Sequence, residues 1–235
     1  MPYIALAMKR RLALTLTALL SVSLVVVPGR ADNSRAAYEA MGIQPADVLS
    51  GTVLVAKVLP GSAHKQVVTV TTYLTGKRAN HEAVNVRLDV FRHAAGELVR
   101  VYGRDFGEEL GGLVGKGELQ LVDLDLDGVN EIIVSYESFL DRLIEQRLGE
   151  VIFNRDGVFR TAWSGALDYD ATRAARDVPR ERRDRFHREF DFRNTMRTRG
   201  VTLFMKKHMI AVAGERLPQP KIVEETFPLR ESGPR

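Results

Sequence analysis

The sequence predicts a mainly β fold: a single domain of antiparallel hairpins with a blade-like sheet and a few short helices. Three observations predict it. Residues 67–74 (VVTVTTYL) are β-branched almost throughout, and residues 83–91 alternate apolar with polar side chains, as a half-buried strand does. Turn signals recur between such runs, as at Asp156-Gly157. The chain has no cysteine, so its stability has to come from a packed core rather than from disulfides.

The N-terminus has the pattern of a cleavable signal peptide. A basic cluster at residues 9–11 precedes an uncharged apolar run at 12–27, and the small residues Gly29 and Ala31 sit where a signal peptidase would cut. The apolar run is shorter than the roughly 20 residues that a membrane-spanning helix needs, although an uncleaved anchor is the alternative. We therefore expect residues 1–31 to be removed, the product to be periplasmic or extracellular, and contact with a membrane to occur only through this segment.

Removing the predicted signal peptide changes the charge of the chain. The full sequence has a formal net charge of +4, and residues 1–31 contain four basic residues and no acidic one. The remaining chain is therefore neutral. A nucleic-acid-binding protein normally carries a surplus of positive charge, so we do not expect a nucleic-acid partner.

The elements expected along the chain follow from local patterns. A helical lead-in at 32–49 is followed by a β-rich domain at 50–229 and a flexible tail at 230–235. An arginine-rich helical insertion is expected at about 170–199, opened by Pro179. A short helix is expected at 139–145, and a loop at Pro218 and Pro220. Strands are expected at 52–59, 67–74, 83–91, 98–102, 119–122, 132–136, 150–153, 158–163, 201–205, 209–212 and 222–227.

One segment, between the predicted strands 119–122 and 132–136, carries recognisable chemistry. Carboxylates at alternate positions converge when a loop curls around a point, and Gly128 permits the sharp turn. Without a cation, such close carboxylates would repel one another. The candidate ligands of a hard cation such as calcium are Asp123, Asp125, Asp127, the carbonyl of Val129, and Glu131. The alternative is a plain hairpin turn with acidic solubilising residues.

Residues 117–136 resemble the acidic loop of FG-GAP and VCBS-type repeats, which occur in integrin α-subunit propellers and in many exported bacterial proteins. The resemblance implies calcium as a cofactor, with Asp123, Asp125, Asp127 and Glu131 at the ligand positions. It also implies adhesion or ligand binding, with an unidentified protein or glycan as the partner. The loop is not an EF-hand, because Val134 replaces the bidentate glutamate and the flanks are strands. Because the motif occurs once, we do not expect a full seven-bladed propeller.

The first functional hypothesis is an exported, calcium-stabilised β domain that acts as a binding or structural module. A second is a hydrolase-like periplasmic enzyme with structural calcium. No Gly-x-Ser-x-Gly motif is present and the five histidines show no metal-binding spacing, so only a pocket with a carboxylate pair or a histidine near Glu131 would favour it. Asp168 and Asp170 are a possible second acidic site, but a solvated turn is the preferred interpretation.

A third hypothesis is binding of a polyanion by the arginine-rich segment. Acidic residues are interleaved with the arginines, and Glu181 and Asp184 each precede an arginine by four residues, which favours salt-bridged pairs on a solvated helix face instead. The candidate polyanion-binding residues are Arg180, Arg182, Arg183, Arg185 and Arg188.

Overall fold

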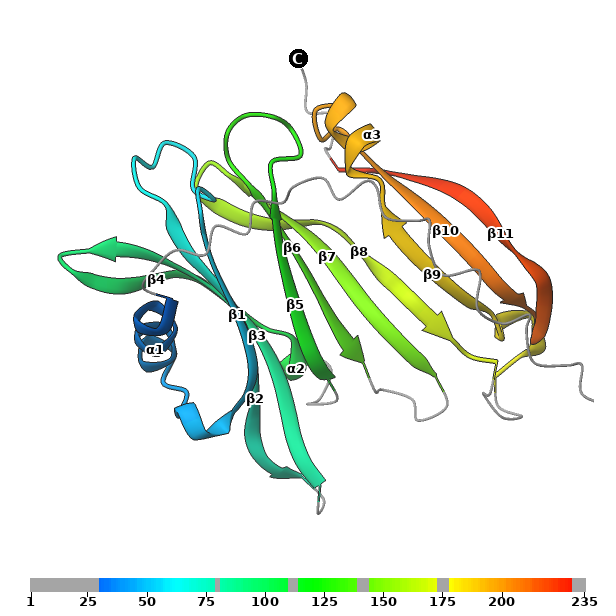
Figure 1. Ribbon diagram of the computed structural model, residues 1–235, viewed down its shortest axis with the longest axis horizontal. Coiled ribbons are helices and arrows are strands. Elements are labelled where there is room, and N and C mark those ends of the chain that lie inside the picture. The colour runs from blue at the N-terminus through cyan, green and yellow to red at the C-terminus, as the bar shows by residue number, and fades with distance from the viewer. Residues whose placement is uncertain (1–29, 79–80, 110–113, 139–143, 173–177, 230–235) are drawn as a thin grey trace, which may run out of the picture. The chain divides into compact units, whose positions relative to one another are not determined.

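The fold is mainly β, as predicted, and the strand pairs among the described residues are all antiparallel (Figure 1). A computed structural model describes residues 30–78, 81–109, 114–138, 144–172 and 178–229. Nearly all of the predicted signal peptide, the predicted tail at 230–235 and most of the short helix predicted at 139–145 lie outside the described residues. Within the described part of the chain, no helix is both long enough and apolar enough to cross a bilayer.

The first sheet has four strands in the order β1-β2-β3-β4. Each strand pairs with its sequence neighbour, so the sheet is a meander of hairpins. The hairpin predicted from the alternating run at 83–91 is β3–β4. The bounds are β1 (Val48–Ala56), β2 (Gln66–Arg78), β3 (His81–Ala94) and β4 (Glu97–Asp105).

The second sheet has seven strands in the order β11-β10-β9-β8-β7-β6-β5, again a meander. Both edges, β5 and β11, come from the ends of this half of the sequence. The bounds are β5 (Val114–Val122), β6 (Glu131–Ser138), β7 (Glu145–Arg155), β8 (Val158–Asp170), β9 (Arg185–Phe190), β10 (Thr202–Val212) and β11 (Glu215–Pro228).

The helical lead-in predicted at 32–49 corresponds to α1 (Arg30–Met41) and the 3-10 turn η1 (Pro45–Asp47). Helix α1 covers the first sheet, because Ala37 and Met41 share a core with Val67 and Phe91. The remaining helical elements are α2 (Phe106–Glu109), η2 (Arg180–Arg182) and α3 (Phe192–Arg197).

The two sheets pack against each other through a common core. Val68 and Val86 of the first sheet are buried in one cluster with Val134 and Ile152 of the second. Gly117 of β5 allows close approach: a Cβ there would lie 2.5 Å from Val70 and 2.7 Å from Val86. A separate core within the second half of the chain contains Leu124, Ile133, Val151, Phe153, Trp163, Leu167, Leu203, Met205 and Leu229.

The polar face of β3 is buried, which the alternation of its sequence does not indicate. Asp89 has no solvent-exposed surface. Its carboxylate lies 2.9 Å from Arg87 Nε and 3.5 Å from a guanidinium nitrogen of Arg100. Burial raises the pKa of Asp89 to about 6, although Arg87 opposes the shift.

We expect Asp89 to make the free energy of unfolding depend on pH. A carboxyl whose folded-state pKa lies above its unfolded value binds an extra proton in the folded state, so its contribution is greatest at low pH. The contribution should fall by on the order of 2–3 kcal/mol as pH rises from about 4 to 6, and stay constant above that. Urea denaturation of wild type and Asp89→Asn at several pH values measures this difference. A difference that is independent of pH, or equal to that for exposed Glu97→Gln, would contradict the expectation.

The arginine-rich segment is not the helical insertion that the sequence predicts. Residues 185–190 form strand β9, which pairs with β10 along its length and with the end of β8. The expected helical pairs of Glu181 with Arg185 and of Asp184 with Arg188 are replaced by contacts between strands. The helix prediction was wrong for residues 185–190, because strand pairing outweighs a charge spacing worth only a few tenths of a kcal/mol. Elsewhere in the predicted range, η2 and α3 are helical.

The prediction of a loop at Pro218 and Pro220 is also wrong, since both prolines lie within β11. The turn before this strand is instead at Ala213 and Gly214, which both have positive φ angles. Strand β11 is the edge of its sheet, and its pairing with β10 is interrupted here: Met209 pairs with Lys221 and Ala211 with Arg216, so both prolines fall between paired positions. Proline is tolerated at such edges and irregularities because it has no backbone amide to donate to the ladder.

Candidate functional site

The acidic segment forms the connection between β5 and β6, where a calcium loop was predicted. Two of its residues have a left-handed backbone, Leu126 with φ 62° and Gly128 with φ 82°. Glycine adopts such angles at little cost, so Gly128 fulfils the turn role that the sequence assigns to it. Leu126 is 58% exposed, so its strained position lies at the outer tip of the loop.

The loop is held in shape by hydrogen bonds from its own backbone. The carboxylate of Asp123 accepts from the amides of Asp127 (3.1 Å) and Gly128 (2.9 Å). Asp127 Oδ1 accepts from the amide of Val129 (2.8 Å). Aspartate side chains that bond to amides a few residues ahead are common in tight turns, so these contacts explain the conformation of the loop and not its ligand.

Neighbouring elements fix the loop from both sides. The side chain of Leu124 is fully buried in the core of the second half of the chain. Asn130 donates from its backbone amide and from Nδ2 to the carbonyl of Lys57, just after β1. Gly200, after α3, is so close that a Cβ on it would lie 3.0 Å from the Cβ of Asp125. The two ends of the acidic loop therefore pack against other segments of the chain, while its tip at residues 126–128 is exposed to solvent.

Three of the predicted carboxylates converge. Asp123, Asp125 and Glu131 each offer an oxygen, and these oxygens lie within 4.8 Å of one another. Asp127 is not in this group. Val129 contributes a buried side chain, and its carbonyl remains a predicted ligand. The chain thus supplies a cluster of hard oxygen donors, the kind of ligand set that Ca²⁺ and Mg²⁺ require.

Glu131 is the most unusual member of the cluster. Only 4% of its surface is exposed, and Glu131 Oε2 accepts a 2.6 Å hydrogen bond from the amide of Leu124. Burial raises the pKa of Glu131, the charges of Asp125, Asp123 and Asp127 add to the shift, and the hydrogen bond from Leu124 opposes it; together these effects bring the pKa to about 8. Without a cation, the folded protein therefore holds this carboxyl largely protonated at neutral pH. A divalent cation among the same oxygens would reverse this preference by neutralising the carboxylates.

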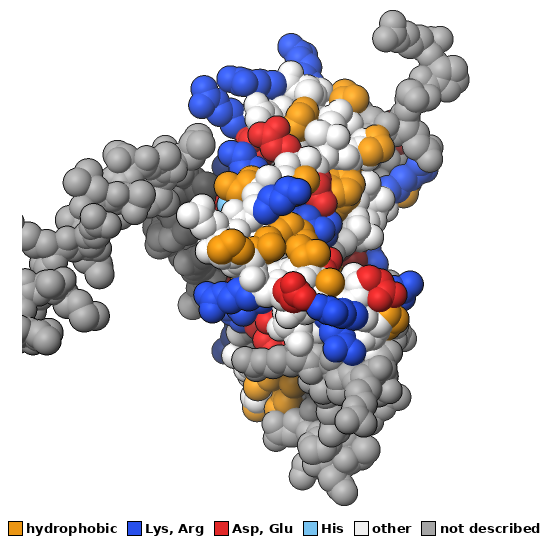
Figure 2. Space-filling model, turned by 90° about the vertical axis from the view of Figure 1, so that its right-hand side faces the viewer, with side chains coloured by type: hydrophobic (Ala, Val, Ile, Leu, Met, Phe, Trp, Pro, Cys, Tyr) orange, Lys and Arg blue, Asp and Glu red, His pale blue; other side chains and the backbone are white. Residues whose placement is uncertain are grey.

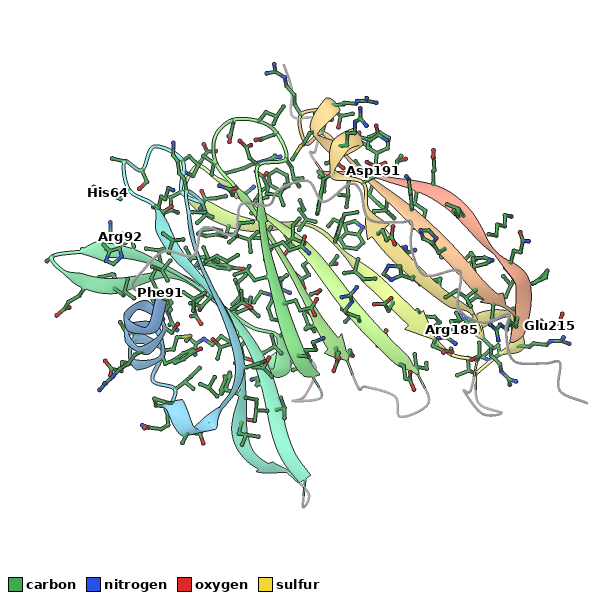
Figure 3. All side chains as sticks on the ribbon, viewed as in Figure 1. His64, Phe91, Arg92, Arg185, Asp191 and Glu215 are labelled. Carbon is green, nitrogen blue, oxygen red and sulfur yellow. The ribbon has the colours of Figure 1, made fainter. Side chains whose placement is uncertain are left out.

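The candidate polyanion-binding arginines are engaged with the protein itself. Arg180 pairs with Glu215, Arg185 with Asp170 (3.3 Å), and Arg188 with Glu225 (2.6 Å). Arg183 donates to the carbonyl of Val178, and Arg182 is exposed. Figure 3 shows Arg185 and Glu215 at one end of the second sheet and Asp191 at the other.

One face of the molecule also has mixed charge. On the face shown in Figure 2, basic side chains are interspersed with acidic and hydrophobic ones instead of forming one continuous patch. Mixed charge of this kind is typical of an ordinary solvated surface, and a polyanion would gain less there than on an unpaired arginine stripe.

A second polar cluster, which sequence reasoning missed, lies on β7, β8 and β9. Arg147 Nε lies 2.7 Å from Asp168, and Asp168 lies 2.5 Å from His187 Nδ1. Asp168 is therefore part of a paired strand, not the solvated turn that the sequence favours. Arg147 and His187 line a groove of about 240 Å³, together with Glu118, Gln120, Ile133, Ser135, Leu167, Arg188, Glu189, Phe190 and Phe192. Arg147, Asp168 and His187 are far apart in the chain, so only strand register could have predicted the cluster.

No family model, curated protein or solved structure matches this chain. The resemblance to FG-GAP and VCBS-type repeats therefore rests on residues 117–136 alone. The function has to be argued from the geometry of the two clusters.

Proposed function

We propose that this protein is an exported calcium-binding β domain that acts as a binding or structural module, with calcium held by Asp123, Asp125 and Glu131. The observation that carries the proposal is a nearly fully buried carboxyl, Glu131, whose neighbours are three further carboxylates. A buried acid normally pairs with a base, because burying uncompensated charge is costly. A cation bound among these carboxylates would supply positive charge next to the buried Glu131.

The position of the loop suggests what the ion would do. Asp123 follows β5 directly and Glu131 is the first residue of β6, so a bound cation would join the ends of two paired strands. Asp125 lies against Gly200, so the ion would also support the packing of the segment after α3. The metal has no catalytic role in this proposal. It neutralises the loop and fixes the surface that neighbouring loops present to a protein or glycan partner.

Calcium titration by calorimetry, with thermal melts in calcium and in chelator, tests the proposal. We expect one ion per chain at this loop, and stabilisation of about 2.7 kcal/mol when free calcium is about 100 times the dissociation constant. Asp125→Asn should abolish most of the binding. Asp127→Asn should weaken it much less, because Asp127 lies outside the converging group.

The control is Asp156→Asn, in the Asp-Gly turn between β7 and β8. This turn is also a tight β-hairpin connection, with φ 53° at Asp156 and 81° at Gly157, and it has a single carboxylate. Its substitution should leave calcium binding unchanged. Equal loss in the Asp125, Asp127 and Asp156 variants, or no heat and identical melts for the wild type, would reduce the loop to an acidic hairpin.

A further inference from the structure

We propose a second metal site, for zinc or a similar transition metal ion, formed by His187, Glu189 and His208 on the second sheet. It shares no residue with the acidic loop, and it does not depend on the proposed calcium function. Its ligand class also differs: imidazole nitrogen with one carboxylate suits zinc, whereas calcium prefers oxygen ligands throughout.

Strand register brings the three side chains together. His187 of β9 lies directly opposite His208 of β10, so the two imidazoles share one face of the sheet. Their ring centroids are 6.2 Å apart. Glu189 is two residues beyond His187 on the same strand, and alternation places it on that same face. Two neighbouring histidines and one carboxylate are thereby presented on a rigid element.

The carboxylate of Glu189 lies between the two imidazoles. One of its oxygens is 3.5 Å from His187 Nε2, and the other is 3.6 Å from His208 Nε2. Ligands about 2.0–2.2 Å from a tetrahedral zinc ion are separated from one another by roughly 3.3–3.6 Å. Each contact is longer than a hydrogen bond and close to the spacing between two ligands of one ion, but the two contacts use different oxygens of Glu189, so an ion is shared by all three residues only after a side chain turns. The side chain of Glu189 is 58% exposed, so it is free to rotate and complete the closure.

The protonation of His187 favours a metal at its other nitrogen. His187 Nδ1 lies 2.5 Å from Asp168, a carboxylate that can only accept, so Nδ1 carries the proton. In the neutral imidazole, Nε2 then presents a lone pair toward the lone pairs of Glu189. Two acceptors facing each other repel unless a proton or a metal ion lies between them.

His208 supplies an independent observation. Its Nε2 atom is buried and has no hydrogen-bond partner among the described residues. A buried polar atom without a partner is costly, and such atoms in native proteins call for an explanation such as a ligand or an ion. A metal ion between His208 and Glu189 would satisfy this nitrogen.

The surrounding charges form a supporting shell. Asp168, which orients His187, is itself held by Arg147, whose Nε lies 2.7 Å away. A carboxylate on the far nitrogen of a ligating histidine fixes the ring and raises its basicity as a ligand. Lys206 lies opposite Glu189, but its amine is directed to Asp191 at 4.0 Å, and Arg185 is paired with Asp170. Lys206 and Arg185 thus pair with other acids and not with Glu189.

The site borders the groove on this sheet. His187 and Glu189 are among the residues that line it. Three protein ligands leave one tetrahedral position for water or for an oxygen of a bound molecule, as in zinc sites with two histidines and one glutamate. The groove therefore provides a place from which a small ligand could reach the ion.

Zinc titration of the protein, purified without a polyhistidine tag, tests this proposal. Calorimetry should give one zinc per chain, and cobalt should produce the intense visible absorption of a four-coordinate ion. His187→Ala and His208→Ala should each abolish binding. Asp168→Asn should weaken it by about 10- to 100-fold, because Asp168 only orients a ligand.

Two controls distinguish this site from zinc binding by other histidines and from metal binding at the acidic loop. His93→Ala, at a histidine near the end of β3, should leave zinc affinity unchanged, and so should Asp125→Asn. Thermal melts in chelator establish that each variant is folded. Absence of zinc binding in the wild type would overturn the proposal, as would binding that survives in folded His187→Ala and His208→Ala proteins.

Discussion

Glu131→Gln is expected to change the free energy of unfolding in opposite directions with and without calcium. In chelator, the variant should be more stable than the wild type, because a neutral amide replaces a carboxyl whose ionised form is opposed by burial and by three aspartates. Its amide oxygen can still accept the hydrogen bond from Leu124, and its NH₂ group can donate to the neighbouring carboxylates. In calcium, the variant should lose most of the stabilisation that the wild type gains, because a charged ligand is missing.

In chelator, the difference in free energy of unfolding between Glu131→Gln and the wild type should increase with pH. The folded-state pKa of Glu131 is about 8, above its ordinary value of 4.5, so the folded wild type loses stability as pH rises between these values. The neutral amide of the variant does not titrate. Because each unit of pKa shift corresponds to about 1.4 kcal/mol, the advantage of Glu131→Gln should reach a few kcal/mol above pH 8 and shrink toward pH 5.

Chemical denaturation in chelator and in calcium, at pH 5.5, 7 and 8.5, measures these changes, and Asp156→Asn serves as the control. A purely structural role for Glu131 predicts that the variant is destabilised equally in both solutions. That result, or an advantage that shrinks as pH rises, would remove the main support for the calcium site.

The parts of the fold that could be predicted are those that depend on local pattern. Alternation in residues 83–91 predicted strand β3, and the Asp-Gly turn predicted the hairpin β7–β8. The acidic loop was placed correctly between two strands because its ligand spacing and its glycine act within a few residues. Its convergence was predicted only in part. Asp127 is held by the backbone of the loop, a detail that residue spacing does not contain.

The parts that could not be predicted depend on contacts between distant segments. Helix α1 and the side chain of Arg100 bury the polar face of β3, so an alternating strand turned out to be covered on both sides. The packing of the acidic loop depends on segments far away in the chain, such as that of Gly200, which lies against Asp125. His187, Glu189 and His208 have no recognisable metal-binding spacing, because their proximity comes from the register of β9 and β10.

Arg104→Met is expected to be among the most destabilising single changes on the surface shared by the two sheets. Arg104 of β4 forms an ion pair with Glu150 of β7 and donates to Thr161 Oγ1 of β8 at 2.9 Å. Glu150 is 3% exposed and also accepts hydrogen bonds from Thr161 (3.1 Å) and Tyr136 (3.4 Å). Removing the guanidinium would leave the buried carboxylate without its cation, which typically costs about 3–5 kcal/mol.

The double variant Arg104→Met/Glu150→Gln separates the cost of an unpaired charge from the net contribution of the pair. Once the carboxylate is also neutral, its desolvation no longer opposes folding, so the double variant should be more stable than Arg104→Met alone. Arg180→Met is the matched control, because Arg180 pairs with Glu215 where both side chains are about 70% exposed. An exposed pair contributes at most about 1 kcal/mol, so this variant should be nearly neutral.

Urea denaturation of the wild type and the three variants measures these differences in the free energy of unfolding. Two results would contradict this expectation. One is an equal loss of unfolding free energy in Arg104→Met and Arg180→Met, and the other is a double variant that is less stable than Arg104→Met.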